Sequence, residues 1–366
     1  MRLLVIILLF SVKAIAQPVA ATILMSHRFA HVYMLSIDYT QCGSSSSTNF
    51  PVLVSLTSTA LKTVANGGNV VNTVTFNGQT VPADLCFAMS ANFATLLSWD
   101  IEFYDASAGT IKAWVNIATV SNTVNTVFYM GVGSTITTYQ GGAVGAAWNS
   151  NYKGVWHLQN GTTLSALDAT SNANNGTING VTAATGNIDG GGNFTRASSQ
   201  YIGCGTSTSL NASTAVTLSA WIKTASNANY LDILSKRTSG GAVNYQIAMD
   251  AAGKVEWWNG SGGLINPTVL STGTWYHVVA TNTNSSNTLN FYINGSITTT
   301  NGSPALGSTN TGNLTIGRNG DGAGEYFDGV IDEPRVMTSV ISADWITTEY
   351  NSQKSGSTFL TTTQLY

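Results

Sequence analysis

The sequence predicts an all-β protein made of two β-sandwich domains. Only 8% of its 366 residues are charged and 43% are hydrophobic, so Thr, Ser, Asn and Gly must supply the polar surface. These residue types suit pleated strands and tight turns better than helices. Strand-like segments recur roughly every ten residues. The dipeptide Asn-Gly, which adopts two-residue hairpin turns readily, occurs nine times.

The first half contains a series of strand-like segments separated by turn residues. They are Phe50–Thr57, Asn72–Phe76, Leu96–Tyr104, Gly109–Ile117 and Asn125–Gly133. A stretch rich in Gly, Ala and Asn follows them, and we place the domain boundary at its end, near Ser150. We therefore expect a lead-in over residues 17–36 and a first β-sandwich over residues 37–150.

The second half continues the same pattern and ends in one helix. Its strand-like segments are Lys153–Leu158, Ala215–Thr224, Tyr230–Lys236, Asn244–Met249, Lys254–Trp258, Trp275–Thr281, Leu289–Ile293, Asn313–Arg318 and Phe327–Met337. Only Ser342–Tyr350 has helical character, with Ser342 as its N-cap. We expect a second domain over residues 151–353 and a low-complexity tail over residues 354–366.

The second domain resembles the concanavalin A-like, laminin-G-like jelly rolls of secreted bacterial and phage-borne proteins. The resemblance is carried by GVWHL, LSAWIKT, GTWYHVVAT, FYINGS and YFDGVIDEPRV, which occur in the order typical of that family. It covers about 200 residues, from Tyr152 to Gln353. It implies a jelly roll that is used for binding.

The first domain resembles a bacterial β-domain, the domain of unknown function 2341. The motifs FPVLVSL, DIEFYDASAGTIKAWVNI and VFYMGVG carry this resemblance, whereas residues 71–92 depart from the family pattern. The function of that family is not established. This resemblance therefore implies a fold and no activity.

The first 16 residues have the features of a signal peptide. Arg2 precedes the apolar run Leu3–Phe10, and Ala14-Ile15-Ala16 fits a small-x-small cleavage site. The charge of Lys13 close to this site is unusual, and the alternatives are an uncleaved anchor or a misplaced start codon. We expect a secreted protein, extracellular or at the cell surface, with no membrane span after signal removal.

The three cysteines fit an oxidising compartment. A Cys42–Cys86 disulfide would contribute about 3–4 kcal/mol through loop closure, with Cys204 left over. The alternative is three unpaired, buried thiols. No Cys/His spacing typical of a zinc site is present.

Sequence patterns typical of catalysis are absent, so we expect no enzyme. The adjacent Asp332 and Glu333 point to opposite faces of a strand and cannot form the matched pair that glycoside hydrolysis needs. No nucleophile elbow and no phosphate-binding loop is found. We interpret His157 and His277 as structural. A net charge of -3 offers no footprint for nucleic acid.

Two loops contain oxygen-bearing side chains that suit calcium. Asp168, Asn172 and Asn174, with Asn175, form the first set, and Asn319, Asp321 and Glu325 form the second. Relatives of this jelly roll often bind calcium near such loops, but their Phe-Asp-Gly reads Phe194-Thr195-Arg196 here. The alternative is Asn-rich turn chemistry without a metal.

Strand alternation points to one exposed aromatic ring. In KVEWW, Val255 and Trp257 share one face, while Lys254, Glu256 and Trp258 share the other, so Trp258 should face solvent. With the neighbouring Asn259 it is the first candidate sugar platform. The second set of candidates from nearby loops comprises Tyr230, Arg318, Asn319 and Tyr326. The alternative is that the neighbouring domain covers Trp258.

Three functions remain open. The first is an exported carbohydrate-binding or adhesive protein whose partner is a neutral glycan or surface polysaccharide. The second is a structural or assembly protein of a cell surface, filament or virion appendage, for which the weakly charged surface would serve self-association. The third is a divergent glycoside hydrolase.

Overall fold

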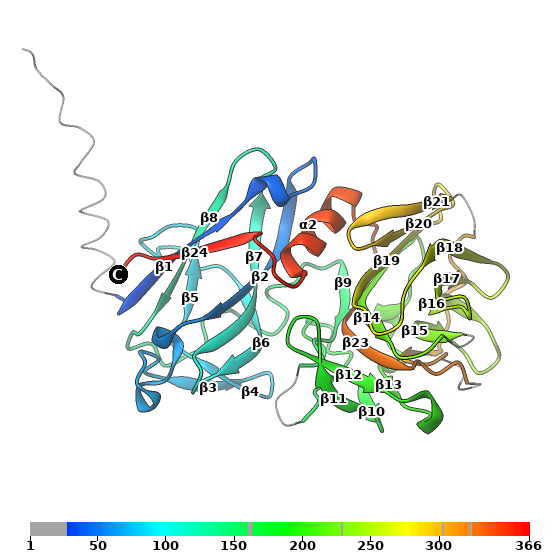
Figure 1. Cartoon of the computed structure of the whole chain (residues 1–366), viewed down its shortest axis with the longest axis horizontal. Helices are drawn as coiled ribbons and strands as arrows, with labels where there is room; N and C mark the ends of the chain where they lie inside the picture. The colour runs from blue at the N-terminus through cyan, green and yellow to red at the C-terminus, as the bar shows by residue number, and fades with distance from the viewer. Residues whose placement is uncertain (1–27, 160–162, 228–229, 302–303, 321, 323) are drawn as a thin grey trace, which may run out of the picture.

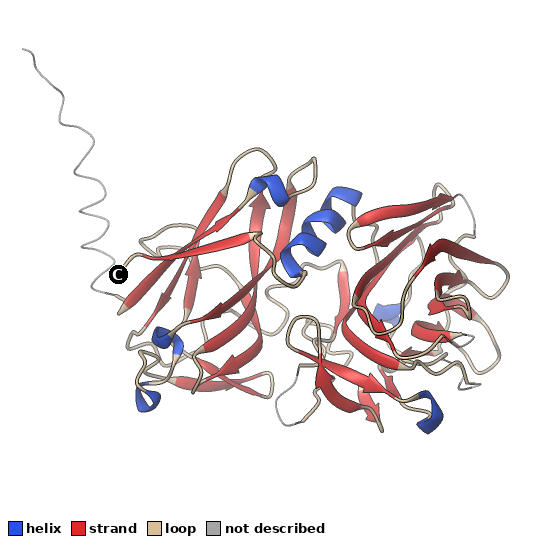
Figure 2. Ribbon diagram, in the orientation of Figure 1, coloured by secondary structure: helices blue, strands red, loops and turns tan. Residues whose placement is uncertain are grey.

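The computed structural model describes residues 28–366 except 160–162, 228–229, 302–303, 321 and 323, and it shows two sandwich domains side by side (Figure 1). The predicted signal peptide and most of the lead-in lie outside the described residues. Strands dominate both domains, and helix α2, Ala343–Gln353, lies where the domains meet (Figure 2). The all-β prediction is confirmed.

The N-terminal domain contains a four-stranded sheet in the order β24-β1-β8-β5, a three-stranded sheet in the order β2-β7-β6 and the hairpin β3-β4. The strands are β1 His31–Ile37, β2 Ser47–Thr57, β3 Thr73–Phe76, β4 Gln79–Pro82, β5 Cys86–Ala88, β6 Trp99–Asp105, β7 Thr110–Val120, β8 Thr126–Val132 and β24 Leu360–Gln364. Short 3-10 turns cover Tyr39–Gln41, Thr59–Leu61 and Val64–Asn66.

Two segments that the sequence placed outside the domains are strands. The predicted lead-in ends in β1, and the predicted tail contains β24, which pairs antiparallel with β1 from Tyr33↔Gln364 to Ile37↔Leu360. Phe359, just before β24, is 1% exposed and belongs to the core. The tail prediction is therefore wrong. Its Thr-rich composition reflects an edge strand with an exposed face.

The C-terminal domain is a jelly-roll sandwich of a seven-stranded sheet, β10-β13-β22-β15-β16-β17-β18, and an eight-stranded sheet, β11-β12-β23-β14-β19-β20-β21, with β9 pairing β23. The strands are β9 Tyr152–Val155, β10 Thr177–Asn179, β11 Thr182–Thr185, β12 Gly190–Phe194, β13 Tyr201–Gly203, β14 Ala215–Thr224, β15 Leu231–Arg237, β16 Val243–Met249, β17 Lys254–Trp258, β18 Gly263–Val269, β19 Tyr276–Thr283, β20 Thr288–Ile293, β21 Ser296–Asn301, β22 Asn313–Ile316 and β23 Gly329–Met337. Short 3-10 turns cover Arg196–Ser198 and Thr208–Leu210.

Local chemistry explains the turns and the helix boundary. Asn294 and Gly295 both have positive φ, 51° and 77°, as a two-residue turn between β20 and β21 requires. The Ser342 hydroxyl accepts a hydrogen bond from the backbone N–H of Trp345 at 3.1 Å, so Ser342 caps α2 as predicted. No helix among the described residues has the length and apolar character needed to cross a membrane.

One hydrophobic core continues from the N-terminal domain into the face of the C-terminal domain that packs against it. Tyr152, Met337 and Ile346 from the C-terminal side share a cluster with the N-terminal strands. The rings of Phe50 and Trp345 lie 4.8 Å apart between centroids. The two domains are therefore joined by apolar packing as well as by the chain.

The predicted Cys42–Cys86 disulfide is absent. All three cysteines are free thiols. Cys86 lies in β5 within a small apolar cluster that includes Phe29 and Phe93. Cys42 follows the first 3-10 turn, and its thiol donates to the Asp38 carbonyl at 3.8 Å. Burial raises the pKa of Cys42 to about 11 and that of Cys86 to about 12, so both thiols stay protonated. The alternative of unpaired thiols is correct.

Candidate functional site

A pocket of about 430 Å³ lies on the outer face of the seven-stranded sheet, over β15 to β18. These strands form the side of the C-terminal domain that faces away from the N-terminal domain (Figure 1). The lining residues are Tyr230, Arg237, Gln246, Glu256, Trp257, Trp258, Gly263, Leu264, Ile265 and Glu325. Its size and its mix of aromatic and polar walls suit a small ligand.

Strand register brings the central side chains of the pocket together. Gln246 pairs with Trp258 across β16 and β17, while the alternate residues Ile247 and Trp257 point into the core. The Trp258 ring is 37% exposed, so it faces solvent as alternation predicted. Gly263 lies opposite on β18, where a Cβ would come within 3.0 Å of Trp258 Cε3. The glycine therefore allows the ring to lie against the sheet.

The Gln246 amide and the Glu325 carboxylate line the inner wall of the pocket, and the buried Asp232 contacts the amide. Gln246 Nε2 donates to Asp232 Oδ1 at 2.7 Å and to Glu325 Oε2 at 3.3 Å. Asn319 Nδ2 also donates to Glu325 Oε2, at 3.0 Å. Burial, followed by the charge of Glu325, raises the pKa of Asp232 well above its usual value.

Several acceptors in this wall have no donor. Gln246 Oε1 and Asp232 Oδ2 are buried without a hydrogen-bond donor. No donor to the Glu256 carboxylate is found among the residues that the structure describes. Burial, together with the charges of Asp250 and Glu325, raises the pKa of Glu256 to about 7. Glu256 therefore presents an acceptor to the pocket without a donor from the described residues, and a ligand that carries hydrogen-bond donors would satisfy it.

The pocket rim contains two residues with unfavourable backbone conformations. Tyr230 and Glu325 have φ of 55° and 59°, which side chains other than glycine rarely adopt. Each such residue costs on the order of 1–2 kcal/mol. Strain of this kind is concentrated at binding sites, where it fixes the direction of a side chain.

The structure brings together some of the predicted ligand-binding residues and separates others. Trp258 and Tyr230 both line the pocket, and Asn319 orients Glu325. Asn259 is engaged in its own turn, because its Oδ1 accepts from the backbone N–H groups of Ser261 and Gly262.

Two further candidates, Arg318 and Tyr326, do not line this pocket. The Arg318 guanidinium lies 3.5 Å from the centre of the Tyr201 ring. Sequence reasoning missed Asp232, Glu256 and Gln246. Alternation placed Glu256 beside Trp258, but nothing in the sequence indicated that Asp232 and Glu325 would meet there.

In the predicted calcium loop, the side chains of Asp168, Asn172 and Asn174 already form hydrogen bonds within the protein. Asp168 Oδ1 accepts from the backbone N–H groups of Val155 and Thr170, and Oδ2 accepts from the Thr170 hydroxyl and the Asn174 N–H, all within 3.1 Å. The side-chain amides of Asn172 and Asn174 donate to backbone carbonyls. Calcium would have to displace these donors, so the Asp168 carboxylate does not fit a metal in this arrangement. Asp321 lies outside the described residues.

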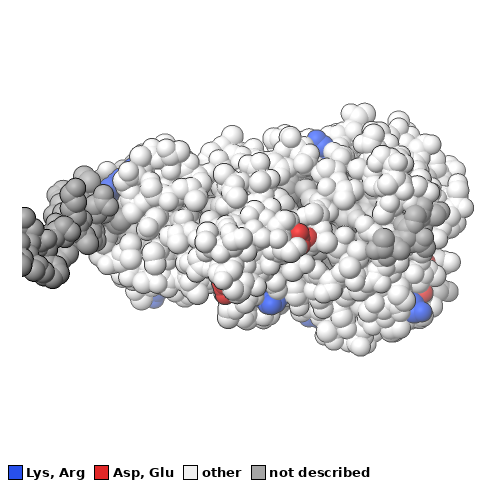
Figure 3. All heavy atoms as spheres, turned by 90° about the horizontal axis from the view of Figure 1, so that it is seen from above, with Lys and Arg blue, Asp and Glu red and all other residues white. Residues whose placement is uncertain are grey.

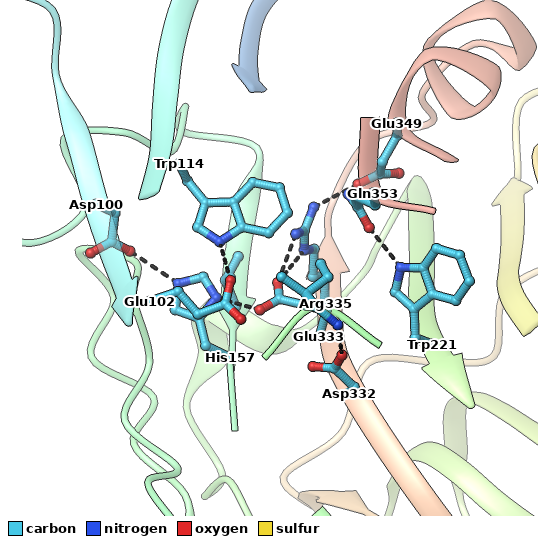
Figure 4. A network of polar contacts seen from close by, with 12 residues as sticks. Asp100, Glu102, Trp114, His157, Trp221, Asp332, Glu333, Arg335, Glu349 and Gln353 are labelled. Carbon is cyan, nitrogen blue, oxygen red and sulfur yellow. Dashed lines mark hydrogen bonds and ion pairs between the residues drawn. The ribbon is translucent and has the colours of Figure 1, made fainter. Parts of the chain in front are cut away.

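A second polar cluster is buried between the domains (Figure 4). His157 Nδ1 lies 2.5 Å from Glu333 Oε1, and His157 Nε2 lies 3.2 Å from Asp100 Oδ2 of β6. Arg335 forms ion pairs with Glu333 at 2.7 Å and with Glu349 of α2 at 2.6 Å. The cluster thus connects both domains and α2.

Opposite charges lie beside one another in this cluster. We therefore interpret the cluster as a structural joint, meaning a set of buried ion pairs that holds the two domains together. Burial alone would lower the pKa of His157, but Glu333 and Asp100 outweigh it and hold the pKa well above the usual value. Glu102, His157 and Glu333 bring three potential metal-ligand atoms within 4.8 Å of one another. However, the protonated imidazole already supplies the cation that Glu333 and Asp100 need, and Arg335 adds a second. The interpretation of His157 as structural agrees with this geometry.

The neighbouring Asp332 has a structural role. Its Oδ2 accepts hydrogen bonds from the backbone N–H groups of Asn187 and Ile188, at 2.8 and 3.0 Å. It therefore holds the loop between β11 and β12 against β23. Asp332 and Glu333 contact different partners, so they do not form a catalytic pair.

Residues 196–347 match the family model described as the concanavalin A-like lectin/glucanases superfamily. Together with the sheet order, this match confirms the predicted concanavalin A-like, laminin-G-like jelly roll. The match does not extend into the N-terminal domain, where the resemblance to the domain of unknown function 2341 stays a prediction. No curated protein matches the chain.

Solved structures with similar folds include the following three. Domain 4 of an extracellular arabinanase from Geobacillus stearothermophilus, in complex with arabinotriose, is 19% identical, with a TM-score of 0.45, over 54% of this chain and 97% of that one. The binding domain of Paraclostridial Mosquitocidal Protein 1 is 15% identical, with a TM-score of 0.45, over 55% and 52%. A heptameric pentraxin from Limulus polyphemus is 20% identical, with a TM-score of 0.32, over 38% and 71%. The chain spans about half the length of the second of these structures.

Proposed function

We propose that the protein binds a carbohydrate in the pocket over β15 to β18 and catalyses no reaction. The observation that carries this proposal is the exposed Trp258 ring beside the Glu256 carboxylate, which receives no hydrogen bond from the described residues. The match of residues 196–347 to a superfamily of lectins and glucanases supports the same ligand class.

The pocket offers the two kinds of contact that a sugar ring needs. An indole provides a flat apolar surface for the C–H face of a pyranose, and Tyr230, 47% exposed, stands at the rim as a second ring. Sugar hydroxyls would donate to Glu256, which lines the pocket. The ligand would thus satisfy a carboxylate that the described residues leave without a donor.

Replacement of the indole tests this proposal. In Trp258→Ala the stacking surface is lost, and we expect affinity for the bound glycan to fall by about 2 kcal/mol, close to thirty-fold in Kd. A glycan array identifies the ligand, and calorimetry measures the loss. Tyr39→Ala removes an aromatic ring that is 39% exposed in the N-terminal domain, and it serves as the matched control. If wild type and Trp258→Ala bind the glycan with equal affinity, this pocket is not the binding site.

Calcium enters the proposal at the second predicted loop alone. Glu325 and Asn319 of that loop reach the pocket wall, whereas the first loop is internally satisfied. If calcium supports glycan binding, a chelator will weaken binding and added calcium will restore it. If the hydrogen bonds of Asn319 and Gln246 suffice to hold Glu325, the chelator will have no effect.

We also propose that the protein is exported and acts in adhesion. The signal-like sequence of residues 1–16 supports a location outside the cell or at its surface. A surface polysaccharide would be the partner there. Detection of the mature N-terminus by mass spectrometry, at Gln17 if cleavage follows Ala16, checks this part independently of binding.

A divergent glycoside hydrolase is the second candidate, because Glu256 and Glu325 line the same pocket. A carboxyl group with a pKa of about 7 is suited to general acid catalysis. Glu325, however, already accepts hydrogen bonds from Gln246 and Asn319, which favours a structural role for this carboxylate over that of a second catalytic group. Release of reducing sugars that is lost in Glu256→Gln would establish the hydrolase.

An assembly role is favoured by the sparse surface charge, since the face drawn in Figure 3 carries few charged side chains. The exposed side chains of Ile265 and Val269 on the edge strand β18 add apolar surface. Self-association would appear as concentration-dependent sedimentation in the absence of any glycan. A monomer at all concentrations would remove this candidate.

A further inference from the structure

The pocket over β15 to β18 carries more negative than positive charge. Glu256 and Glu325 line it. Arg237, at the end of β15, is the cation among the lining residues. Lys254 shares the outer face of β17 with Glu256, two residues away, and Asp250 adds a further negative charge next to it.

Glu256 lines the pocket without a compensating partner from the described part of the chain. Among the described residues nothing donates a hydrogen bond to it, and no ion pair with Lys254 or Arg237 is formed. A partly buried carboxylate without a partner is costly. A positively charged ligand group would remove this cost, whereas a hydroxyl would remove only part of it.

The aromatic rings of the pocket favour the same kind of ligand. Trp258 follows Glu256 at i+2 on the same strand face, so the ring and the carboxylate are neighbours. A cation beside an indole is stabilised by the negative face of the ring. A pocket in which aromatic rings lie beside a hydrogen-bond acceptor that has no donor can therefore bind a cation as well as a sugar ring.

We infer that the glycan taken by this pocket carries a primary ammonium group, held by Glu256 and Glu325 while the sugar ring stacks on Trp258. This inference rests on the proposed glycan pocket and replaces the neutral glycan that the composition suggested. The ligand class is an amino sugar with a free amine. An acetylated amine loses the charge and should behave as a neutral sugar.

Three probes with the same backbone separate these ligands. Chitosan, chitin and cello-oligosaccharides of equal length present an ammonium, an acetamide or a hydroxyl group at the same carbon. We expect chitosan oligosaccharides to bind at least about ten-fold more tightly than the other two, as charge-assisted hydrogen bonds allow. Added salt should weaken this advantage and leave cello-oligosaccharide binding unchanged.

Glu256→Gln is the decisive variant because the amide preserves the shape of the side chain. Chitosan binding should fall to the level of cello-oligosaccharides in this variant, while the other two probes keep their affinities. Asp38→Asn removes one negative charge from an exposed turn of the N-terminal domain and should change nothing. An unchanged chitosan preference in Glu256→Gln would overturn the inference.

The remaining outcomes distinguish this inference from the proposed function. If neutral probes bind and chitosan does not, the ammonium inference fails and the glycan pocket stands. If no glycan binds, the proposed function fails. If calcium alone binds to wild type, is lost in Glu256→Gln and competes with chitosan, the cation of the site is a metal and the inference is wrong.

Discussion

His157 places a charge between carboxylates that come from two different domains. Its ring nitrogens face Glu333 and Asp100, and all three side chains are at least nine-tenths buried. Removing one charged member of such a cluster leaves the remaining buried charges without an opposite charge beside them. We expect His157→Gln to lower the free energy of unfolding by about 3–5 kcal/mol. Urea unfolding measures the loss, with His31→Gln at the first residue of β1 as the control.

The pH dependence of this loss follows from the raised pKa of His157. A group whose pKa is higher in the folded state stabilises fully below its unfolded pKa, about 6.5 for histidine, and this contribution disappears as pH rises through the folded value. The difference between wild type and His157→Gln should therefore be largest near pH 6 and should shrink in alkaline solution. A difference that grows with pH would show that His157 is neutral in the fold.

Single residues also show how far the sequence could predict the site. The exposure of Trp258 followed from alternation within five residues, because a strand fixes which side chains share a face. Gln246 and Glu325, in contrast, meet across 79 residues, and His157 and Glu333 meet across 176. Such contacts depend on the pairing of whole sheets, which local patterns do not encode. The two polar clusters were therefore invisible before the structure.

At the scale of elements, β24 closes the N-terminal sheet from the far end of the chain. Phe359 anchors it in the core, and we expect Phe359→Ala to cost about 3–5 kcal/mol and to speed hydrogen exchange in β1, its pairing partner. Thr362→Ala on the exposed face of β24 is the control. If β1 keeps its protection in Phe359→Ala, the strand is not held by this anchor.

Strands with clear alternation or hairpin turns were predictable, and others were not. LNFYI followed by Asn-Gly predicted β20 and its turn with β21, and KVEWW predicted β17 with its bounds. The sequence LTTTQ of β24 has no apolar alternation, because side chains on both of its faces are exposed. β18 was missed for the same reason, since Pro267 and the exposed residues around it resemble a loop.

At the scale of the whole molecule, the shared core and the buried joint should make the two domains unfold together. We expect one calorimetric transition whose van't Hoff and calorimetric enthalpies agree. Ile346→Ala, in the shared core, should lower the protection of β7 and β16 alike, whereas the exposed Val340→Ala should not. Two separate transitions would mean that the interface contributes little.

The pairing of β24 with β1 determines when the N-terminal sheet can be completed during translation. A ribosome completes β24 only after it has made the entire jelly roll, so the edge of β1 stays uncovered for most of translation. The N-terminal sheet cannot reach its final form until synthesis is nearly finished. Shortened chains that stop after α2 would consequently carry an open strand edge, where unwanted pairing between molecules begins.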